Sequence, residues 1–81
     1  MTKLTSAQRY VLQHLANGGR LFEHYMRFGM TNASGSNYER TRSCTVDALW
    51  ERKLIVTEAQ RDMRLYYNIT PAGRAALEGK S

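Results

Sequence analysis

The hydrophobic residues near the start of the chain recur at the spacing of an α-helix. Ala7, Val11 and Leu15 lie four residues apart, so they share one face of a helix. Residues 5–8, Thr-Ser-Ala-Gln, have the pattern of a capping box, in which Thr and Gln side chains bond backbone N–H groups at the helix start. A pair of glycines ends the run, because glycine readily adopts the left-handed conformation that closes helices. The pattern predicts a helix over residues 6–17.

A second helix is predicted over residues 43–53. Val46, Leu49 and Trp50 fall on one face at three- and four-residue spacing. Ser43 or Thr45 is expected to cap the first turn, because a side-chain hydroxyl accepts a hydrogen bond from a backbone N–H group that has no partner within the helix. The helix is net neutral, since its two carboxylates balance its two basic residues.

The C-terminal third has the pattern of a hairpin followed by a helix. Residues 54–59 and 64–70 are interpreted as strands, with a turn at 60–63. A Thr-Pro pair at 70–71 then indicates a helix start, with a capping hydroxyl followed by proline at the first helical position. The short helix that follows ends at a glycine.

Residues 20–42 fit two interpretations. The apolar residues within 21–29 suit either a short helix closed by glycine or a strand rich in β-favouring aromatics. The polar segment 31–37 has the composition of a turn. The favoured interpretation is a hairpin with strands over 20–28 and 37–42, and the short helix is the alternative.

These elements predict one core and a single domain over residues 1–81. A chain of 81 residues is too short for two independent cores. No apolar run approaches the roughly 20 residues that span a bilayer, so a small, soluble, cytoplasmic domain without a membrane partner is expected. The predicted core residues are Val11, Leu12, Leu15, Leu21, Val46, Leu49, Trp50, Leu54, Ile55, Leu65, Tyr67, Ile69 and Leu77.

The net charge of the chain limits the classes of partner that it is expected to bind. Twelve basic residues stand against seven acidic ones, for a formal net charge of +5, and nine of the twelve are arginine. The planar guanidinium group suits phosphate and carboxylate partners. The composition therefore favours nucleic acid, an anionic membrane surface or an acidic protein patch, and argues against a mimic of DNA.

Three segments together resemble the winged-helix domains of small bacterial and phage regulators. Residues 4–21, LTSAQRYVLQHLANGGRL, look like the opening helix and the start of a strand. Residues 45–56, TVDALWERKLIV, look like the third helix running into the first wing strand. Residues 65–79, LYYNITPAGRAALEG, are similar to the Tyr-x-Leu-Thr-x-x-Gly-x-x-x-Leu pattern that closes such domains.

This resemblance implies an α+β, winged-helix-like fold with three helices and a C-terminal two-stranded wing. A standard winged helix has a further helix before its recognition helix, but residues 29–42 contain no amphipathic stretch long enough for one. An extra hairpin is expected to replace this second helix. The function implied is non-enzymatic binding of double-stranded DNA by a transcriptional regulator.

Arginines near the second helix and the wing are the expected DNA contacts. The predicted phosphate or minor-groove contacts are Arg40, Arg42, Arg61 and Arg64. Thr45 and Arg52, on the side of the second helix that a winged helix presents to the major groove, are the candidates for reading base edges. Four phosphate contacts predict a salt slope of about −3 to −4 for duplex DNA. A homodimer is expected if the protein reads a palindrome.

An inhibitor that binds a host protein is the alternative. A weaker resemblance, carried by GGRL at 18–21, SCT at 43–45 and KLI at 53–55, is to small bacterial toxins that inhibit DNA topoisomerase I. Such a protein, from a phage or mobile element, would bind a DNA-processing enzyme or a CRISPR defence complex. The residue types suit it, because Tyr and Arg are enriched at interface hot spots. The candidate interface residues are Tyr38, Arg40, Arg42 and Tyr66.

Nothing in the sequence indicates catalysis, a metal site or a cofactor. Neither His14 nor His24 has a metal-ligand spacing to Cys44 or to another histidine. A single cysteine excludes an internal disulfide and a multi-cysteine zinc site. Cys44 is therefore expected to be a small buried thiol at a helix start.

Overall fold

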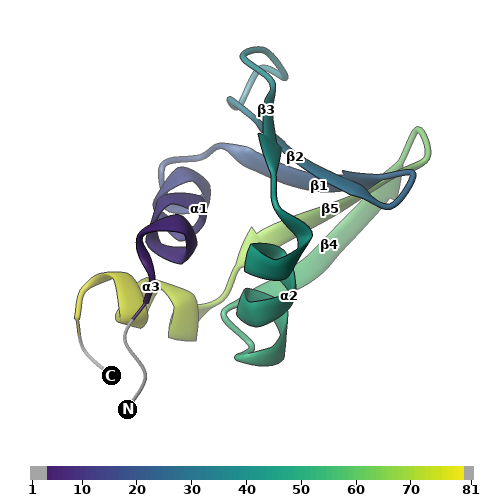
Figure 1. Cartoon of the computed structure of the whole chain (residues 1–81). Coiled ribbons are helices and arrows are strands. Elements are labelled where there is room, and N and C mark those ends of the chain that lie inside the picture. Colours follow the sequence, from purple (N-terminus) through teal and green to yellow (C-terminus); the bar gives the residue numbers. More distant parts are fainter. Residues whose placement is uncertain (1–3, 80–81) are drawn as a thin grey trace.

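A five-stranded antiparallel sheet and three helices form the fold over residues 4–79, which the computed structural model describes (Figure 1). The elements in chain order are α1 (Ser6–Ala16), β1 (Arg20–His24), β2 (Arg27–Thr31), β3 (Glu39–Thr41), α2 (Ser43–Glu51), β4 (Ile55–Arg61), β5 (Arg64–Ile69) and α3 (Pro71–Leu77). The strand order across the sheet is β3-β2-β1-β5-β4. The prediction of an α+β domain with three helices is confirmed.

The start of α1 is stabilised by the predicted capping box. The Gln8 backbone N–H donates to the Thr5 hydroxyl at 3.1 Å, and the Thr5 N–H donates to Gln8 Oε1 at 3.1 Å. This box satisfies two backbone donors that the helix itself leaves without partners. The periodic face of α1 is buried, with Val11, Leu12 and Leu15 in the core.

The start of α3 also follows its sequence signal. Thr70 is the N-cap and Pro71 the first helical residue. The Thr70 hydroxyl accepts from the Gly73 N–H at 3.0 Å and donates to the Lys53 carbonyl at 2.8 Å. Because Lys53 follows α2, this single hydroxyl joins the end of α2 to the beginning of α3.

The first hairpin differs from the prediction. The expected strand over 20–28 is two strands, β1 and β2, joined by a two-residue turn at Tyr25 and Met26. Both turn residues have positive φ, 51° and 65°. Such turns normally use Asn or Gly, so Tyr-Met gives no turn signal. The short-helix alternative for this segment is wrong, and the polar loop connects β2 to the short edge strand β3.

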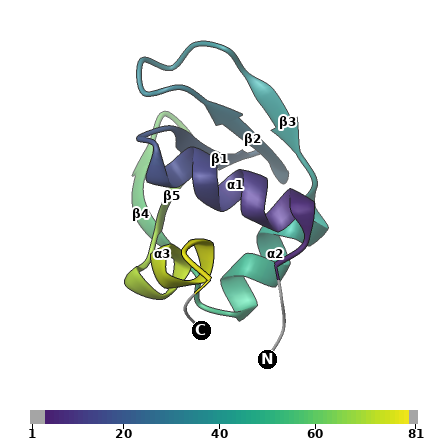
Figure 2. The ribbon, with the colours of Figure 1, turned by 90° about the vertical axis from the view of Figure 1, so that its left-hand side faces the viewer.

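All three helices pack on one face of the sheet (Figures 1 and 2). We call it the inner face; its buried side chains include Leu21 of β1, Met30 of β2 and Tyr67 of β5, which are paired across the sheet. The core cluster consists of Val11, Leu12, Leu15, Leu21, Phe28, Met30, Val46, Leu49, Leu54, Ile55, Tyr67 and Ile69, and Phe22 is buried on the opposite face of the sheet. Leu65 and Leu77 are partly buried against this core.

Trp50 is the one predicted core residue that the structure exposes. Its exposed fraction is 46 %. The indole and the Tyr67 ring meet in an edge-to-face arrangement, with centroids 6.0 Å apart, so Trp50 packs against the border of the core. Phe28 and Met30, which the core prediction left out, are buried, because alternation along β2 directs them to the inner face.

Candidate nucleic-acid interface

Arginines gather on the sheet face that the helices leave open. We call it the outer face. Strand alternation and the observed register place Arg20, Phe22 and His24 of β1 on this face. On the remaining strands the outer-face arginines are Arg27, Arg40, Arg61 and Arg64. Thus every strand of the sheet contributes at least one arginine to the same face.

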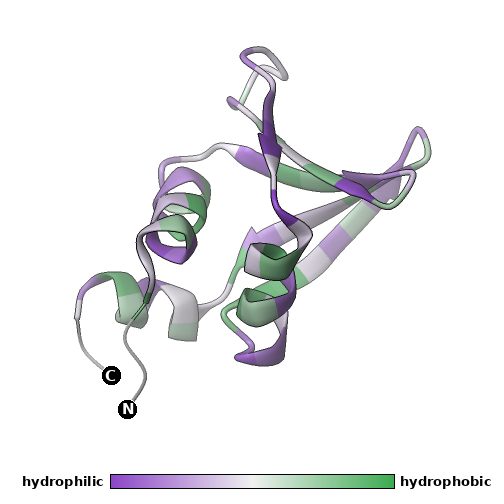
Figure 3. Cartoon of the chain, in the orientation of Figure 1, coloured by the Kyte–Doolittle hydropathy of each residue, from purple (hydrophilic) through white to green (hydrophobic). Residues whose placement is uncertain are grey.

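The carboxylates of the paired strand positions lie on the opposite, inner face. Glu39 of β3 accepts a hydrogen bond from the Tyr10 hydroxyl of α1 at 2.6 Å. Glu23 of β1 accepts from the Tyr67 hydroxyl at 3.5 Å. Charge is therefore segregated across the thickness of the sheet, and the outer face is the positive side. Figure 3 shows hydrophilic segments along β3 and toward the end of the sheet that lies away from the helices.

Two further carboxylates lie near one corner of the outer face. Glu58 stands at the irregular position of β4, where the register shifts, and Asp62 stands in the β4–β5 turn. Both line a recess of about 380 Å³ together with Arg20 and Arg61. Positive charge is therefore least concentrated at this corner and most concentrated toward β2 and β3.

Aromatic rings hold one of these arginines in place. Phe22 is buried on the outer face beneath Tyr38 and Tyr66, with ring centroids 6.1 and 5.7 Å away. The Arg64 guanidinium carbon lies 4.7 Å from the Phe22 centroid, within the range of a cation–π interaction. A Cβ at Gly29 would collide with the Tyr38 ring, so Gly29 lets Tyr38 lie close to the sheet. The cluster presents Arg64 in a preset orientation.

A cavity of about 610 Å³ lies where β2 and β3 meet the N-terminus of α2. We call it the α2 cavity. Its lining consists of Met26, Arg27, Phe28, Arg40, Thr41, Arg42, Ser43 and Cys44. Three of these eight residues are arginines and none is acidic. Arg27 and Arg40 stand at outer-face positions, whereas Phe28 and Thr41 stand at inner-face positions, so residues from both faces of the sheet line this cavity.

The predicted cap of α2 is wrong. The N-cap residue is Arg42, and no side chain caps the helix. Ser43 already has a helical conformation, so it stands one position too late to cap. Thr45 lies deeper in the first turn and is buried, with 8 % exposed.

The burial of Thr45 also removes it from the predicted base-reading residues. A side chain that faces the core cannot reach a base edge. Arg52 is the C-cap residue of α2 and is half-buried. Asp47 and Glu51 lie on the exposed side of α2, and this side therefore carries negative charge.

The remaining predicted contacts separate into two groups. Arg40, Arg61 and Arg64 lie on the outer face, and Arg42 lies at the α2 cavity. The alternative protein-interface residues Tyr38 and Tyr66 each contact Phe22, Tyr38 from above Gly29 of β2 and Tyr66 from β5, again on the outer face. The structure thus brings most of both predicted sets to one connected surface.

Sequence reasoning missed Arg20, Arg27 and His24 as members of this surface. Their signal was present in part, because Arg20, Phe22 and His24 alternate along one strand. Without a recognised turn at residues 25–26, however, Arg27 has no predictable face. A single residue of shift in the register would move it to the opposite side of the sheet.

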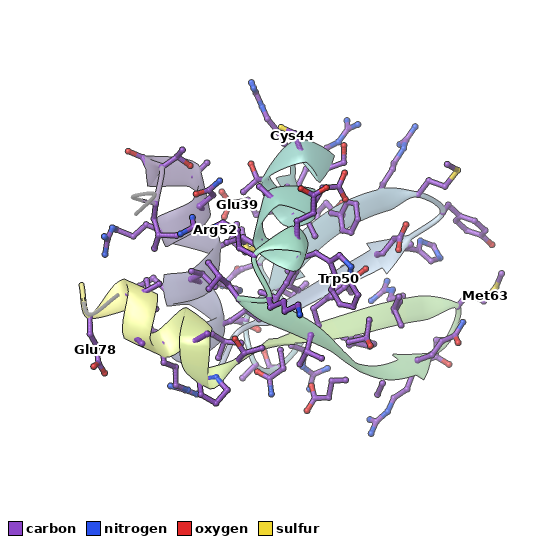
Figure 4. The ribbon with its side chains drawn as sticks, turned by 90° about the horizontal axis from the view of Figure 1, so that it is seen from below. Glu39, Cys44, Trp50, Arg52, Met63 and Glu78 are labelled. Carbon is purple, nitrogen blue, oxygen red and sulfur yellow. The ribbon has the colours of Figure 1, made fainter. Side chains whose placement is uncertain are left out.

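The turns of the two hairpins form an exposed apolar patch. The Tyr25 hydroxyl lies 3.6 Å from Met63 Sδ, so the β1–β2 and β4–β5 turns touch. The exposed fractions are 68 % for Tyr25, 86 % for Met26 and 66 % for Met63. We call these three residues the tip patch. Met63 lies at the opposite end of the molecule from Glu78 of the α3 C-cap (Figure 4).

His14 and Cys44, the other residues considered for chemistry, do not form a site together with further reactive groups among the described residues. His14 Nε2 lies 2.6 Å from the Thr31 carbonyl, and the imidazole packs against Gly19. Cys44 is exposed at the first turn of α2 (Figure 4), which corrects the expectation of a buried thiol. Among residues 4–79, no three His, Cys, Asp or Glu side chains gather as a metal site would require. Within the same residues no helix has the length and apolarity to cross a membrane.

Comparison with known proteins does not assign the chain to a family. No protein-family model, curated protein or solved structure matches the chain. The functional argument therefore rests on the arrangement of charge and aromatic side chains described above.

Proposed function

We propose that this protein is a non-enzymatic DNA-binding protein that holds double-stranded DNA against the outer face of its sheet. The observation that carries the proposal is the segregation of charge. Each strand places an arginine on the outer face, whereas Glu23 and Glu39 face the helices. Such a one-sided basic surface is the electrostatic footprint expected of a nucleic-acid partner.

The charge of α2 argues for this mode of docking over insertion of a recognition helix. The exposed side of α2 carries Asp47 and Glu51, which repel phosphate. On this proposal, α2, the β4–β5 hairpin and α3 correspond to the second half of a winged helix, and the β1–β2 hairpin would replace its second helix. In the proposed mode the sheet and the wing arginines contact DNA, and α2 supports them from behind.

The test is fluorescence anisotropy of a labelled random duplex at about 50 and about 200 mM salt. Five arginine–phosphate contacts predict a log–log salt slope of about −4 to −5. The double variant Arg61→Gln/Arg64→Gln is expected to flatten this slope by about 2 and to weaken binding on all duplex sequences. An absence of duplex binding at the lower salt concentration would refute the proposal.

Two controls make this measurement specific. Arg74→Gln removes one charge from the exposed surface of α3, and it should leave the slope almost unchanged. Unlabelled single-stranded DNA of the same sequence serves as competitor. Stronger competition by the single strand than by the duplex would contradict duplex DNA as the partner, because stacking on Tyr38 and Tyr66 would then outweigh phosphate contacts.

The tip patch favours a second candidate function, inhibition of a host protein. Methionine and tyrosine are enriched at protein interfaces. The three residues of the tip patch are exposed and do not belong to the hydrophobic core. An inhibitor of a DNA-processing enzyme or of a defence complex could bind through this patch.

The test compares proteins captured from a host lysate by the wild type and by Met26→Ser/Met63→Ser. A specific partner must be lost with the variant, and capture that the variant leaves unchanged would contradict this candidate.

A further inference from the structure

A cavity of about 440 Å³ lies on the outer face, beside the β1–β2 turn. We call it the aromatic pocket. Its four strand residues stand at outer-face positions of the register, and Tyr38 lies against Gly29, another outer-face position. The pocket therefore belongs to one face of the sheet, the face that carries the arginines. Its lining consists of Phe22, His24, Tyr25, Arg27, Tyr38 and Arg64.

Four of these six side chains are aromatic rings. Tyr38 is 61 % exposed, and its position is fixed by Phe22, with centroids 6.1 Å apart, and by the missing Cβ of Gly29. The rings of His24 and Tyr25 pack on each other, with centroids 4.2 Å apart. A nucleobase stacks readily on an exposed aromatic side chain, because every base has a π-face. The pocket thus provides a stacking surface for a planar ring.

The two remaining side chains of the aromatic pocket are arginines, and no acidic residue lines it. The Arg64 guanidinium already rests on Phe22, with its carbon 4.7 Å from the ring centroid, so it has little freedom to lose on binding an anion. Arg27 is paired with His24 across the β1–β2 hairpin. Guanidinium groups donate paired hydrogen bonds to phosphate oxygens. A ligand that combines a planar ring with a phosphate matches both halves of this lining, and a nucleotide is such a ligand.

We propose that the aromatic pocket binds one unpaired nucleotide, whose base stacks on Tyr38 and whose phosphate contacts Arg27 and Arg64. Its volume lies within the range of about 300–1,000 Å³ that small-ligand pockets occupy. A paired base is held in its stack, whereas a bulged base leaves the duplex at little cost. The protein therefore prefers duplex DNA with an unpaired nucleotide to fully paired DNA. The choice of DNA as the source of the nucleotide rests on the proposed function.

The test is fluorescence anisotropy with two duplexes that differ at one bulged position. One carries an adenosine bulge and the other an abasic bulge, so the number of phosphates and the break in pairing are the same. We expect the adenosine bulge to bind about five- to tenfold more tightly. This ratio should be similar at about 50 and about 200 mM salt, because counterion release is common to both duplexes. Equal affinities would overturn the nucleotide site and leave the proposed function standing.

Substitutions at Tyr38 test whether its ring supplies the stacking. Tyr38→Leu should reduce the ratio of the two affinities toward one, whereas Tyr38→Phe keeps the ring and should keep the ratio. Tyr10→Leu removes an exposed tyrosine ring from α1 and serves as the control, with the ratio expected to stay that of the wild type. Circular dichroism establishes that each variant is folded. A ratio that survives Tyr38→Leu in a folded protein would overturn the assignment of the base to this pocket.

Titration of the ¹⁵N-labelled wild type with AMP tests the pocket without DNA. We expect saturable shifts in the amides of residues 22–27 and of Tyr38. Arg27→Gln should weaken the AMP affinity about two- to fivefold, and Arg74→Gln, an equal change of charge on α3, should leave it unchanged. Saturable AMP binding without binding of any duplex would support the pocket and refute the proposed function. AMP shifts that are spread over the surface and do not saturate would overturn the pocket.

Discussion

Tyr10 links the first helix to the edge of the sheet through one short hydrogen bond to Glu39. The pKa of Tyr10 is raised above its ordinary value, first because the Glu39 carboxylate accepts a hydrogen bond from the phenolic O–H and also because its charge repels phenolate. The fold therefore favours the protonated phenol. Its stabilising contribution is complete below the ordinary tyrosine pKa of about 10 and is lost as pH rises through the raised value.

Tyr10→Phe tests this contribution. We expect the wild type to be the more stable chain near neutral pH in urea unfolding. The difference in unfolding free energy should shrink as pH rises above about 10, because ionisation removes the hydrogen bond from the wild type. Tyrosinate absorbance of both chains locates the Tyr10 titration. An unchanged stability difference across this range would contradict the role of the hydrogen bond.

Gly73 shows how a single residue can override helix propensity. It lies inside α3, where alanine normally stabilises a helix by about 1 kcal/mol over glycine. A Cβ at this position would collide with the Leu54 carbonyl oxygen and would come within 2.7 Å of Ile69 Cγ1. The Leu54 carbonyl cannot easily move away, because it also accepts from the Thr70 N–H at 3.0 Å.

Gly73→Ala is therefore expected to destabilise the protein by about 1–3 kcal/mol, the range for overpacking a tight contact. Chemical unfolding measures this change. Arg74→Ala, the adjacent exposed substitution in the same helix, serves as control and should change stability by less than about 0.5 kcal/mol. Stabilisation by Gly73→Ala would mean that α3 can shift away from Leu54.

At the scale of elements, the parts of the fold that follow local chemistry were predictable. The capping box of α1, the Thr-Pro start of α3 and the β4–β5 hairpin each have a recognisable signal in a few adjacent residues. The β1–β2 turn could not be predicted, because Tyr25 and Met26 take left-handed conformations that such residues seldom adopt. The absence of a side-chain cap on α2 could not be predicted from the sequence either, because Ser43 is a residue type that commonly caps helices but here lies inside the helix.

The candidate site was predictable in residue type more than in position. The abundance of arginine, including Arg61 and Arg64 of the β4–β5 hairpin, favoured an anionic partner. The face of each arginine depends on strand register, however, and the register of β1 and β2 depends on the unrecognised turn. The prediction that Thr45 reads base edges was wrong because of tertiary packing. The rotation of α2 about its axis is set by the packing of Val46 and Leu49 against the sheet, and it buries Thr45.

The β1–β2 turn holds Tyr25 and Met26 in an unfavourable backbone conformation, and the fold does not require these two side chains. Left-handed backbone costs a non-glycine residue about 1–2 kcal/mol, and Tyr25 and Met26 are both largely exposed. Tyr25→Asn/Met26→Gly installs the preferred sequence for this turn. We expect this double variant to be about 1 kcal/mol more stable in urea unfolding.

The same variant removes two of the three tip-patch side chains. If the tip patch binds a partner protein, stability should rise while partner capture falls. A loss of stability would instead show that the contact between Tyr25 and Met63 supports the fold, and it would remove the argument that the turn is retained for binding.

At the scale of the whole molecule, the distribution of charge matters more than its total. Two triple variants that each remove three positive charges test this statement. Arg20→Gln/Arg27→Gln/Arg40→Gln removes them from the outer face, and Arg9→Gln/Lys53→Gln/Arg74→Gln removes them from the helical side. The first set leaves out Arg64, because its packing on Phe22 also contributes to the fold.

A protein that attracts DNA through net charge alone would lose the same affinity in both variants. Docking on the outer face predicts different results, because only charges near the phosphates release counterions. We expect the outer-face variant to flatten the salt slope for duplex DNA by about 3, and the helical-side variant by less than about 1. Equal slopes for the two variants, with both chains shown to be folded by circular dichroism, would exclude the outer face as the binding surface.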